Sequence, residues 1–198
     1  MATTNRLTLV LGGARSGKSD YAEALAAQMG SRVLYVATAE ALDDEMRARV
    51  AAHQARRPSA WATLEAPLHV GEALRSCAAA AGADVLLLDC LTLLVSNVIL
   101  LGGPDAPEPD PSAAWEWVQA EVESLLAASR ELGANLIVVS NEVGLGVVPP
   151  YSLGRTYRDC LGWANQALAR AADHVILLVA GLPVDLKDLP LAWPDRLG

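Results

Sequence analysis

Five short apolar runs, separated by stretches long enough to form helices, constrain the fold more than any other feature. Each run is nearly continuous in Val, Leu and Ile, which is typical of strands buried on both faces of a parallel sheet. We predict strands at residues 6–11, 32–37, 84–89, 134–140 and 174–180, and helices at residues 18–29, 43–56, 68–81, 112–132 and 153–172. The alternation predicts an α/β fold, with a mostly parallel sheet and helices on both faces.

The length of 198 residues favours a single domain across residues 1–198. Residues 102–111 are rich in proline and glycine, which predicts a loop. We expect an irregular tail from about Gly181, where further prolines follow.

The first predicted strand leads directly into Gly12-Gly-Ala-Arg-Ser-Gly-Lys-Ser19, which matches the Walker A pattern in full. The strand before it and the helix after it are the context in which such a loop binds phosphate. Backbone N–H groups and the helix N-terminus surround the anion, the lysine reaches the β- and γ-phosphates, and the hydroxyl of the last residue binds Mg²⁺. A glycine-rich turn that matches by chance is the alternative. The motif predicts a P-loop NTPase-type, RecA-like fold, with Lys18 as a catalytic residue, Ser19 as a metal ligand, and nucleotide contacts from Gly12, Gly13, Ala14, Arg15, Ser16, Gly17, Lys18 and Ser19.

Asp89 is the candidate acid for the metal. It ends an apolar strand, as a Walker B aspartate does, and would lie at the carboxyl edge of the sheet. The alternative is an N-cap for the segment that follows, since aspartate caps helices well.

Composition excludes several other classes. The net charge of −8 argues against a general nucleic-acid binder. Hydrophobic residues make up 53% of the chain, but the longest apolar run, residues 90–101, is interrupted by polar residues and too short to span a membrane. The N-terminus carries no signal-peptide pattern, so we expect a cytoplasmic protein. The three cysteines lack paired spacing, which favours buried thiols over disulfides or zinc.

His53 lies near the end of a predicted helix whose acids come early and whose basic residues come late. From the residues alone, the simpler interpretation is a surface histidine at a helix C-terminus.

Several motifs along the chain resemble the bifunctional adenosylcobinamide kinase / adenosylcobinamide-phosphate guanylyltransferase family. The resemblance extends from about Leu7 to about Val184, and its most specific parts are Leu42-Asp-Asp-Glu-Met46 and Asn141-Glu-Val-Gly-Leu-Gly146. The other parts are the phosphate loop, Tyr35-Val-Ala-Thr-Ala39, His53, Arg57-Pro58, Trp61-Ala-Thr-Leu-Glu65, Leu88-Asp-Cys-Leu-Thr92, Asn97, Arg155, Arg158-Asp159 and Asn165-Gln166.

The resemblance implies two reactions of cobalamin biosynthesis. The first phosphorylates adenosylcobinamide with ATP or GTP, and the second transfers GMP from GTP to adenosylcobinamide phosphate through a GMP–histidine intermediate. His53 matches that histidine; some members have two adjacent histidines, where this chain has Ala52. The phosphate loop and Asp89 imply Mg²⁺ bound together with the nucleotide. The resemblance implies a homotrimer and nucleotide contacts from Ala37, Thr38, Ala39, Gln54, Ala55, Arg56, Arg57, Glu65 and Asp89.

The chemistry agrees with this resemblance. A neutral imidazole is a good nucleophile near neutral pH, and Arg15, Lys18 and Arg56 or Arg57 would neutralise the charge that develops on phosphate. Glu65 could accept the guanine N1–H and N2–H₂ donors, although a solvated loop acid is the alternative.

The segment 141–146 follows a predicted strand at the edge where α/β proteins bind ligands. Glu142 could bind corrinoid or magnesium there, while a plain turn is the alternative. Trp115 and Trp117 favour packing or a subunit contact over a corrinoid platform. Two other classes remain open: a different P-loop small-molecule kinase in which His53 is structural, and a non-catalytic nucleotide-binding protein.

Overall fold

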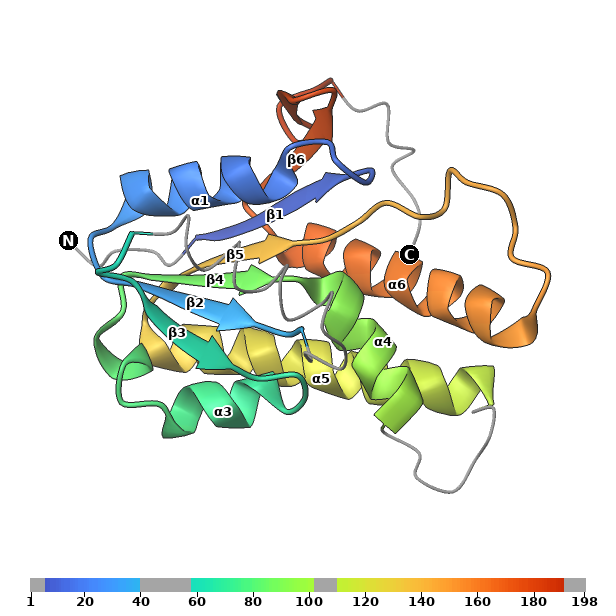
Figure 1. The fold of residues 1–198 in the computed structure, drawn as a ribbon, viewed down its shortest axis with the longest axis horizontal. Coiled ribbons are helices and arrows are strands. Elements are labelled where there is room, and N and C mark those ends of the chain that lie inside the picture. Colours follow the sequence, from blue (N-terminus) through green and yellow to red (C-terminus); the bar gives the residue numbers. More distant parts are fainter. Residues whose placement is uncertain (1–5, 40–57, 102–109, 191–198) are drawn as a thin grey trace.

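The computed structural model describes residues 6–39, 58–101 and 110–190. Its centre is a seven-stranded sheet in the order β3-β2-β4-β5-β1-β6-β7 (Figure 1). The β6–β7 pair is antiparallel and all other neighbours are parallel. The strands are β1 (Leu7–Gly12), β2 (Val33–Ala37), β3 (Ala62–Glu65), β4 (Val85–Asp89), β5 (Asn135–Val139), β6 (His174–Val179) and β7 (Leu182–Asp185).

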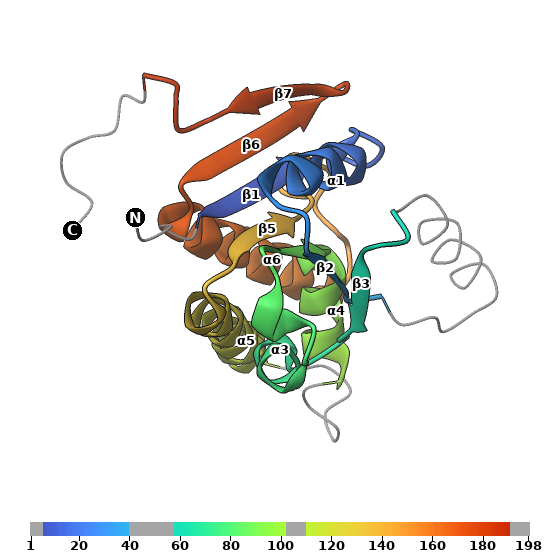
Figure 2. The same ribbon diagram turned by 90° about the vertical axis from the view of Figure 1, so that its left-hand side faces the viewer.

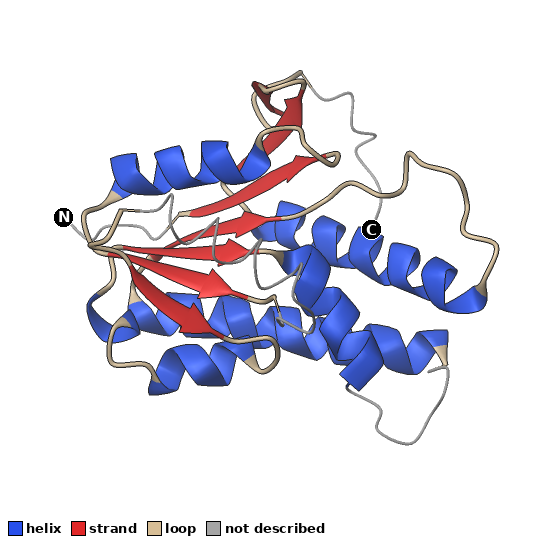
Figure 3. Cartoon of the chain, in the orientation of Figure 1, coloured by secondary structure: helices blue, strands red, loops and turns tan. Residues whose placement is uncertain are grey.

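Helices cover both faces of the sheet (Figures 2 and 3). Helix α1 packs against the face that carries side chains such as Val10, Tyr35 and Leu87. The opposite face, with Leu34 and Leu86, packs against the other helices. This alternation of strand side chains between two buried layers confirms the predicted α/β class. The helices are α1 (Lys18–Met29), α3 (Val70–Ser76), α4 (Leu91–Leu101), α5 (Pro111–Leu132) and α6 (Ser152–Ala171), with a 3₁₀ turn at Ala80–Gly82.

The five predicted strands are all present, with ends that differ by at most one residue from those predicted. The predicted helix at residues 18–29 is α1. The helix predicted at 112–132 is α5, which begins one residue earlier, and the helix predicted at 153–172 is α6, which begins and ends one residue earlier. The predicted helix at 68–81 is wrong in extent, because it is divided into α3 and the 3₁₀ turn. The predicted helix at 43–56 lies outside the described residues.

Three elements were not predicted: β3, α4 and β7. The expectation of an irregular tail from Gly181 is wrong as far as Asp185, because β7 pairs there with β6. Both β3 and β7 are four-residue edge strands whose side chains are mostly exposed, so they lack an apolar run. Helix α4 has the opposite character. Its buried residues follow one face, but the rest of its surface also carries leucines, such as Leu93 and Leu100, so its sequence forms a nearly continuous apolar run.

Two acidic side chains cap the N-terminal ends of helices α5 and α3. Asp110 accepts hydrogen bonds from the backbone N–H groups of Ser112 and Ala113 and so caps α5. The buried Glu121 of α5 accepts from the N–H groups of His69 and Val70, which lie at the start of α3. The only N-terminal cap on α3 that we observe therefore comes from a neighbouring helix rather than from its own sequence.

Within the described part of the chain, no helix combines the length and the apolar character that crossing a membrane requires.

Candidate active site

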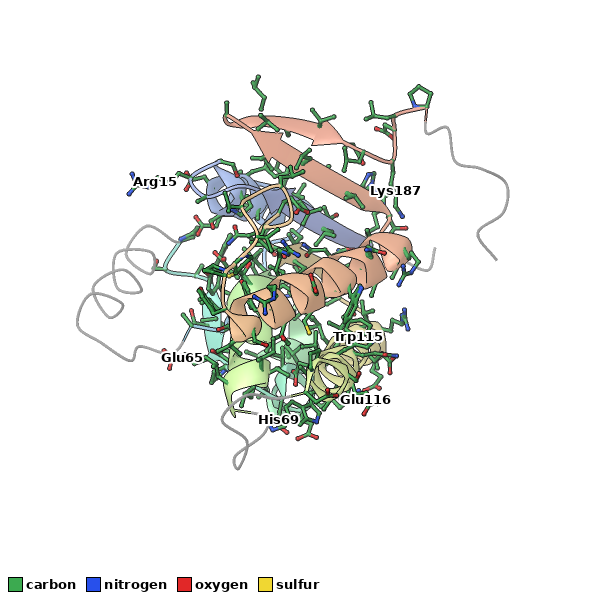
Figure 4. The ribbon with its side chains drawn as sticks, turned by 90° about the vertical axis from the view of Figure 1, so that its right-hand side faces the viewer. Arg15, Glu65, His69, Trp115, Glu116 and Lys187 are labelled. Carbon is green, nitrogen blue, oxygen red and sulfur yellow. The ribbon has the colours of Figure 1, made fainter. Side chains whose placement is uncertain are left out.

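The phosphate loop lies between β1, which ends at Gly12, and α1, which begins at Lys18. The Lys18 ammonium donates a hydrogen bond to the Gly13 carbonyl at 2.8 Å, so the side chain folds back over the loop. Arg15, at the tip of the loop, points away from the body of the protein (Figure 4). The loop is therefore already curled around the position where a phosphate would bind.

A cavity of about 450 Å³ opens beside this loop, at the carboxyl ends of β2, β4 and β5. Ala37, Asp89 and Val139 are the last residues of these three strands, and all of them line it. The sequence-predicted residues that the structure brings together here are Ala14, Arg15, Lys18, Ser19, Ala37, Ala39 and Asp89.

The Asp89 carboxylate is oriented from within the sheet. The buried hydroxyl of Tyr35 donates to Asp89 Oδ2 at 2.9 Å. Tyr35 lies opposite Leu87 in the β2–β4 ladder, so its ring reaches the strand end diagonally. Helix α4 begins at Leu91, two residues after Asp89.

Ser19 and Asp89 both line the cavity and offer a hydroxyl and a carboxylate oxygen. Hard oxygen donors of this kind are the protein ligands that Mg²⁺ prefers when nucleotide phosphates complete its coordination. The residues present therefore fit a magnesium–nucleotide complex.

Burial sets the protonation of the groups around this cavity. Desolvation lowers the pKa of Lys18 below its ordinary value, while Cys90 and Asp89 act in the opposite direction. Desolvation, together with the charge of Asp89, raises the pKa of the Cys90 thiol to about 11. Cys90 is thus a neutral thiol at neutral pH.

Other predicted residues lie around the cavity rather than on its lining. Thr38 is fully buried, and its hydroxyl donates to the Cys90 carbonyl and accepts from the Cys90 N–H, so it links the ends of β2 and β4. Glu65 is exposed at the end of β3, opposite Ala37 in the ladder. Gly12, Gly13, Ser16 and Gly17 form the backbone of the phosphate loop. The predictions for His53, Gln54, Ala55, Arg56 and Arg57 fall outside the described residues.

The structure adds residues that sequence reasoning did not assign to the site. Tyr35, Cys90, Thr92 and Asn141 also line the cavity. The Thr92 hydroxyl accepts from the N–H of Asn141 at 3.0 Å, which ties the start of α4 to the segment after β5. Asn165 of α6 donates to the Asn141 carbonyl, so that segment is held from two sides. For Asn141 the sequence did offer an indication, because this residue begins the segment 141–146 that was predicted to lie at the ligand-binding edge.

The β6–β7 hairpin supports the phosphate loop from the side. Its turn contains Ala180 and Gly181, both with positive φ angles. The Gly181 N–H donates to the Ser16 carbonyl at 3.0 Å. A second backbone bond, from Glu142 N–H to the Gly12 carbonyl, holds the first residue of the loop.

Trp115, for which the sequence favours packing or a subunit contact, packs within the chain. Its ring meets that of Trp163 edge to face, with centroids 5.1 Å apart, and so joins α5 to α6.

A Walker-type loop that opens a helix at the carboxyl edge of a mostly parallel sheet places this chain among the P-loop nucleotide-binding proteins. A family model described as cobinamide kinase / cobinamide phosphate guanyltransferase matches residues 8–186. The chain belongs to this family of transferases, whose substrates are nucleotides and cobinamides.

Three relatives resemble the chain over nearly their full lengths. The bifunctional adenosylcobalamin biosynthesis protein CobP of Pseudomonas aeruginosa is 49% identical, over 92% of this chain and 98% of the relative. The proteins named CobU of Escherichia coli and of Salmonella typhimurium are each 44% identical, over 91% of this chain and 99% of the relative.

Proposed function

We propose that this chain catalyses both reactions that its family name describes. In the first, the hydroxyl of adenosylcobinamide attacks the γ-phosphorus of ATP or GTP, giving adenosylcobinamide phosphate and a nucleoside diphosphate. In the second, GMP passes from GTP to that phosphate, giving adenosylcobinamide-GDP and pyrophosphate. The convergence of Lys18, Ser19 and Asp89 on one cavity, in a member of this family, is the observation that carries the proposal.

In the kinase step the chain binds and orients the triphosphate. Backbone N–H groups of the loop and the N-terminus of α1 hold the phosphates, and Lys18 neutralises charge as the γ-phosphoryl group leaves. Ser19 and Asp89 would hold Mg²⁺, which when bound screens the phosphate charges. Tyr35 keeps the Asp89 carboxylate in place through the hydrogen bond described above.

In the guanylyl step His53 is the nucleophile. A ring nitrogen of its neutral imidazole attacks the α-phosphorus of GTP, a P–N bond forms, and the P–O bond to pyrophosphate breaks. A phosphate oxygen of adenosylcobinamide phosphate then attacks the same phosphorus and displaces the imidazole. Gln54, Ala55, Arg56, Arg57 and Glu65 contact the guanine nucleotide in this proposal. The position of Glu65 at the carboxyl edge, opposite Ala37, supports its part.

The proposal also covers the domain organisation, cellular location and assembly of the enzyme. We infer one catalytic domain across residues 1–198, a cytoplasmic location, and a homotrimeric assembly. The single sheet that joins β1 to β7 supports the inference of one domain.

Lys18→Ala tests the proposal, with Lys187→Ala as a matched control. Lys187 is exposed near the end of β7 and far from Arg15 in Figure 4. We expect Lys18→Ala to lower both phosphoryl and guanylyl transfer by about 10²-fold or more, because it removes a positive charge aimed at the transition state. Lys187→Ala should keep both rates. A folded Lys18→Ala protein with normal rates would overturn the proposal.

A further inference from the structure

A second cavity, of about 180 Å³, lies between the last turns of α4 and the first turn of α6. Its lining from α4 consists of Ser96, Ile99 and Leu100, and its lining from the start of α6 includes Tyr151 and Tyr157. The lining is mainly aliphatic and aromatic, with hydroxyl groups as its polar points.

This cavity continues from the nucleotide cavity along the same two walls. Helix α4 contributes Thr92 to the nucleotide cavity and Ser96 to the second one. At a rise of 1.5 Å per residue, these positions are about 6 Å apart along the helix axis. The opposite wall is the chain between β5 and α6, which lines the nucleotide cavity at Asn141 and the second cavity at Tyr151. The two cavities therefore follow one another along α4.

The chain between β5 and α6 presents apolar side chains to solvent. Leu145 is 91% exposed and Val147 is 95% exposed. Figure 1 shows this chain, in orange before α6, arching beyond the end of the sheet. These exposed aliphatic groups lie on the segment that reaches the second cavity at Tyr151. Exposed apolar side chains next to a binding cavity in the chain are typical of a surface that another molecule covers.

Specific contacts hold this segment in place. Arg155 donates to the carbonyls of Pro149 and Pro150. The ring of Tyr151 packs on the backbone of Gly154 so closely that a Cβ there would lie 2.5 Å from a ring carbon. The segment that carries the apolar side chains is thus anchored where it meets α6, at residues 149–154, which reduces the ordering cost of binding a ligand there.

We propose that the second cavity and the apolar segment 145–151 bind the corrin ring of the cobinamide substrate, with its hydroxyl-bearing arm directed along α4 toward the phosphate loop. This inference rests on the proposed function and assigns the location of its second substrate. A corrin ring is a large, methyl-bearing disc with carboxamides around its rim. It exceeds the volume of the cavity, so one edge enters and one face lies against Leu145 and Val147.

The hydroxyl groups of the cavity match the carboxamide rim. Ser96 and the two tyrosines each offer one donor and acceptor sites. The Tyr157 hydroxyl, like an ordinary tyrosine, carries its proton at neutral pH and can donate to a carboxamide oxygen.

Binding of dicyanocobinamide, without nucleotide, tests the inference. Equilibrium dialysis followed by the visible absorbance of the corrin gives its Kd for the full chain, Leu145→Asp, Tyr151→Ala and the control Leu189→Asp. Leu189 is an exposed leucine after β7 and lies outside both cavities. We expect Leu145→Asp to weaken binding roughly tenfold, because the carboxylate must lose water against an apolar face. Tyr151→Ala should weaken it by a similar factor, and Leu189→Asp should not change it.

A corrinoid-free readout separates this inference from the proposed function. All three variants should form the GMP–protein adduct from GTP as the parent does. Unchanged Kd values in Leu145→Asp and Tyr151→Ala, with both transfer activities present in the parent, would overturn the corrin site alone. If Leu145→Asp or Tyr151→Ala lowered the oligomer mass in analytical ultracentrifugation but kept the affinity for cobinamide, the segment would be a subunit contact, and the corrin site would also be overturned. A parent chain that fails to transfer phosphate to cobinamide would overturn the proposed function.

Discussion

Replacement of Gly181 by alanine tests whether the β6–β7 hairpin positions the phosphate loop. Gly181 has a φ of 82°, and Gly133, at the end of α5, has a φ of 72°. A Cβ at either position meets no atom within 4 Å. The two substitutions therefore impose the same kind of backbone strain, without a steric clash, and Gly133→Ala is a matched control.

The cost in stability should be nearly equal. An L-residue in the left-handed region costs roughly 1–2 kcal/mol. For a chain of this length, each kcal/mol lowers Tm by roughly 2–4 °C. We expect both variants to fold, with Tm lowered by about 2–8 °C.

The effect on nucleotide binding should differ. Only Gly181 donates its N–H to the Ser16 carbonyl, whereas Gly133 donates to the Arg130 carbonyl at the end of α5. Relief of the strain at Gly181 shifts this donor away from the loop. A hydrogen bond worth about 1 kcal/mol then no longer favours the binding-competent loop, which weakens nucleotide binding by up to about fivefold.

Thermal unfolding followed by circular dichroism gives the Tm of both variants, and titration calorimetry gives the Kd for ATP with Mg²⁺. We expect similar Tm values in the two variants but a higher Kd for Gly181→Ala alone. Equal Kd values in the two variants, at equal loss of Tm, would refute a positioning role for the hairpin.

Two further changes test the metal site and the strand ends. Tyr35→Phe should raise the Mg²⁺ concentration needed for half-maximal ATP turnover several-fold, because the Asp89 carboxylate loses a fixed donor; an unchanged requirement would exclude that positioning. The Arg32 guanidinium and backbone lower the pKa of Asp84 from 3.8 to about 2, so its stabilisation is present above 3.8 and lost as the pH falls toward 2. Urea unfolding of Asp84→Asn should show a smaller loss of stability over that range, whereas an identical slope would contradict this linkage.

The sequence was most informative where the structural signal is local. The phosphate loop is a contiguous motif, and the five central strands are buried on both faces, so their apolar runs reveal them. Helix α4 was missed because leucines also occur outside its buried face, so its sequence forms an apolar run rather than a clear amphipathic pattern. The edge strands β3 and β7 were missed because pairing with a neighbour, rather than their own residues, makes them strands.

The site was only partly predictable for a related reason. Tyr35, Asp89 and Asn141 are far apart in the sequence and meet because β2, β4 and β5 are neighbours in the sheet. Strand order is a property of the whole fold, so no local pattern indicates that Tyr35 orients Asp89. Thr38 was predicted from its motif, but its hydroxyl binds the backbone of Cys90, which only the packing of β2 against β4 reveals.

Covalent labelling with GTP tests the proposal that guanylyl transfer proceeds through His53. The protein is incubated with GTP labelled at the α-phosphate, without corrinoid, and separated on a denaturing gel. The unsubstituted protein and His69→Asn should both carry the label. The labelled bond should survive alkali and break in acid, as a phosphoramidate bond does. His53→Asn should still bind GTP but carry no label. His69 is an exposed histidine with a φ of 52°, a conformation that asparagine tolerates, so it is a matched control. Undiminished label in His53→Asn, or no label in a protein that converts adenosylcobinamide phosphate normally, would exclude His53 as the nucleophile.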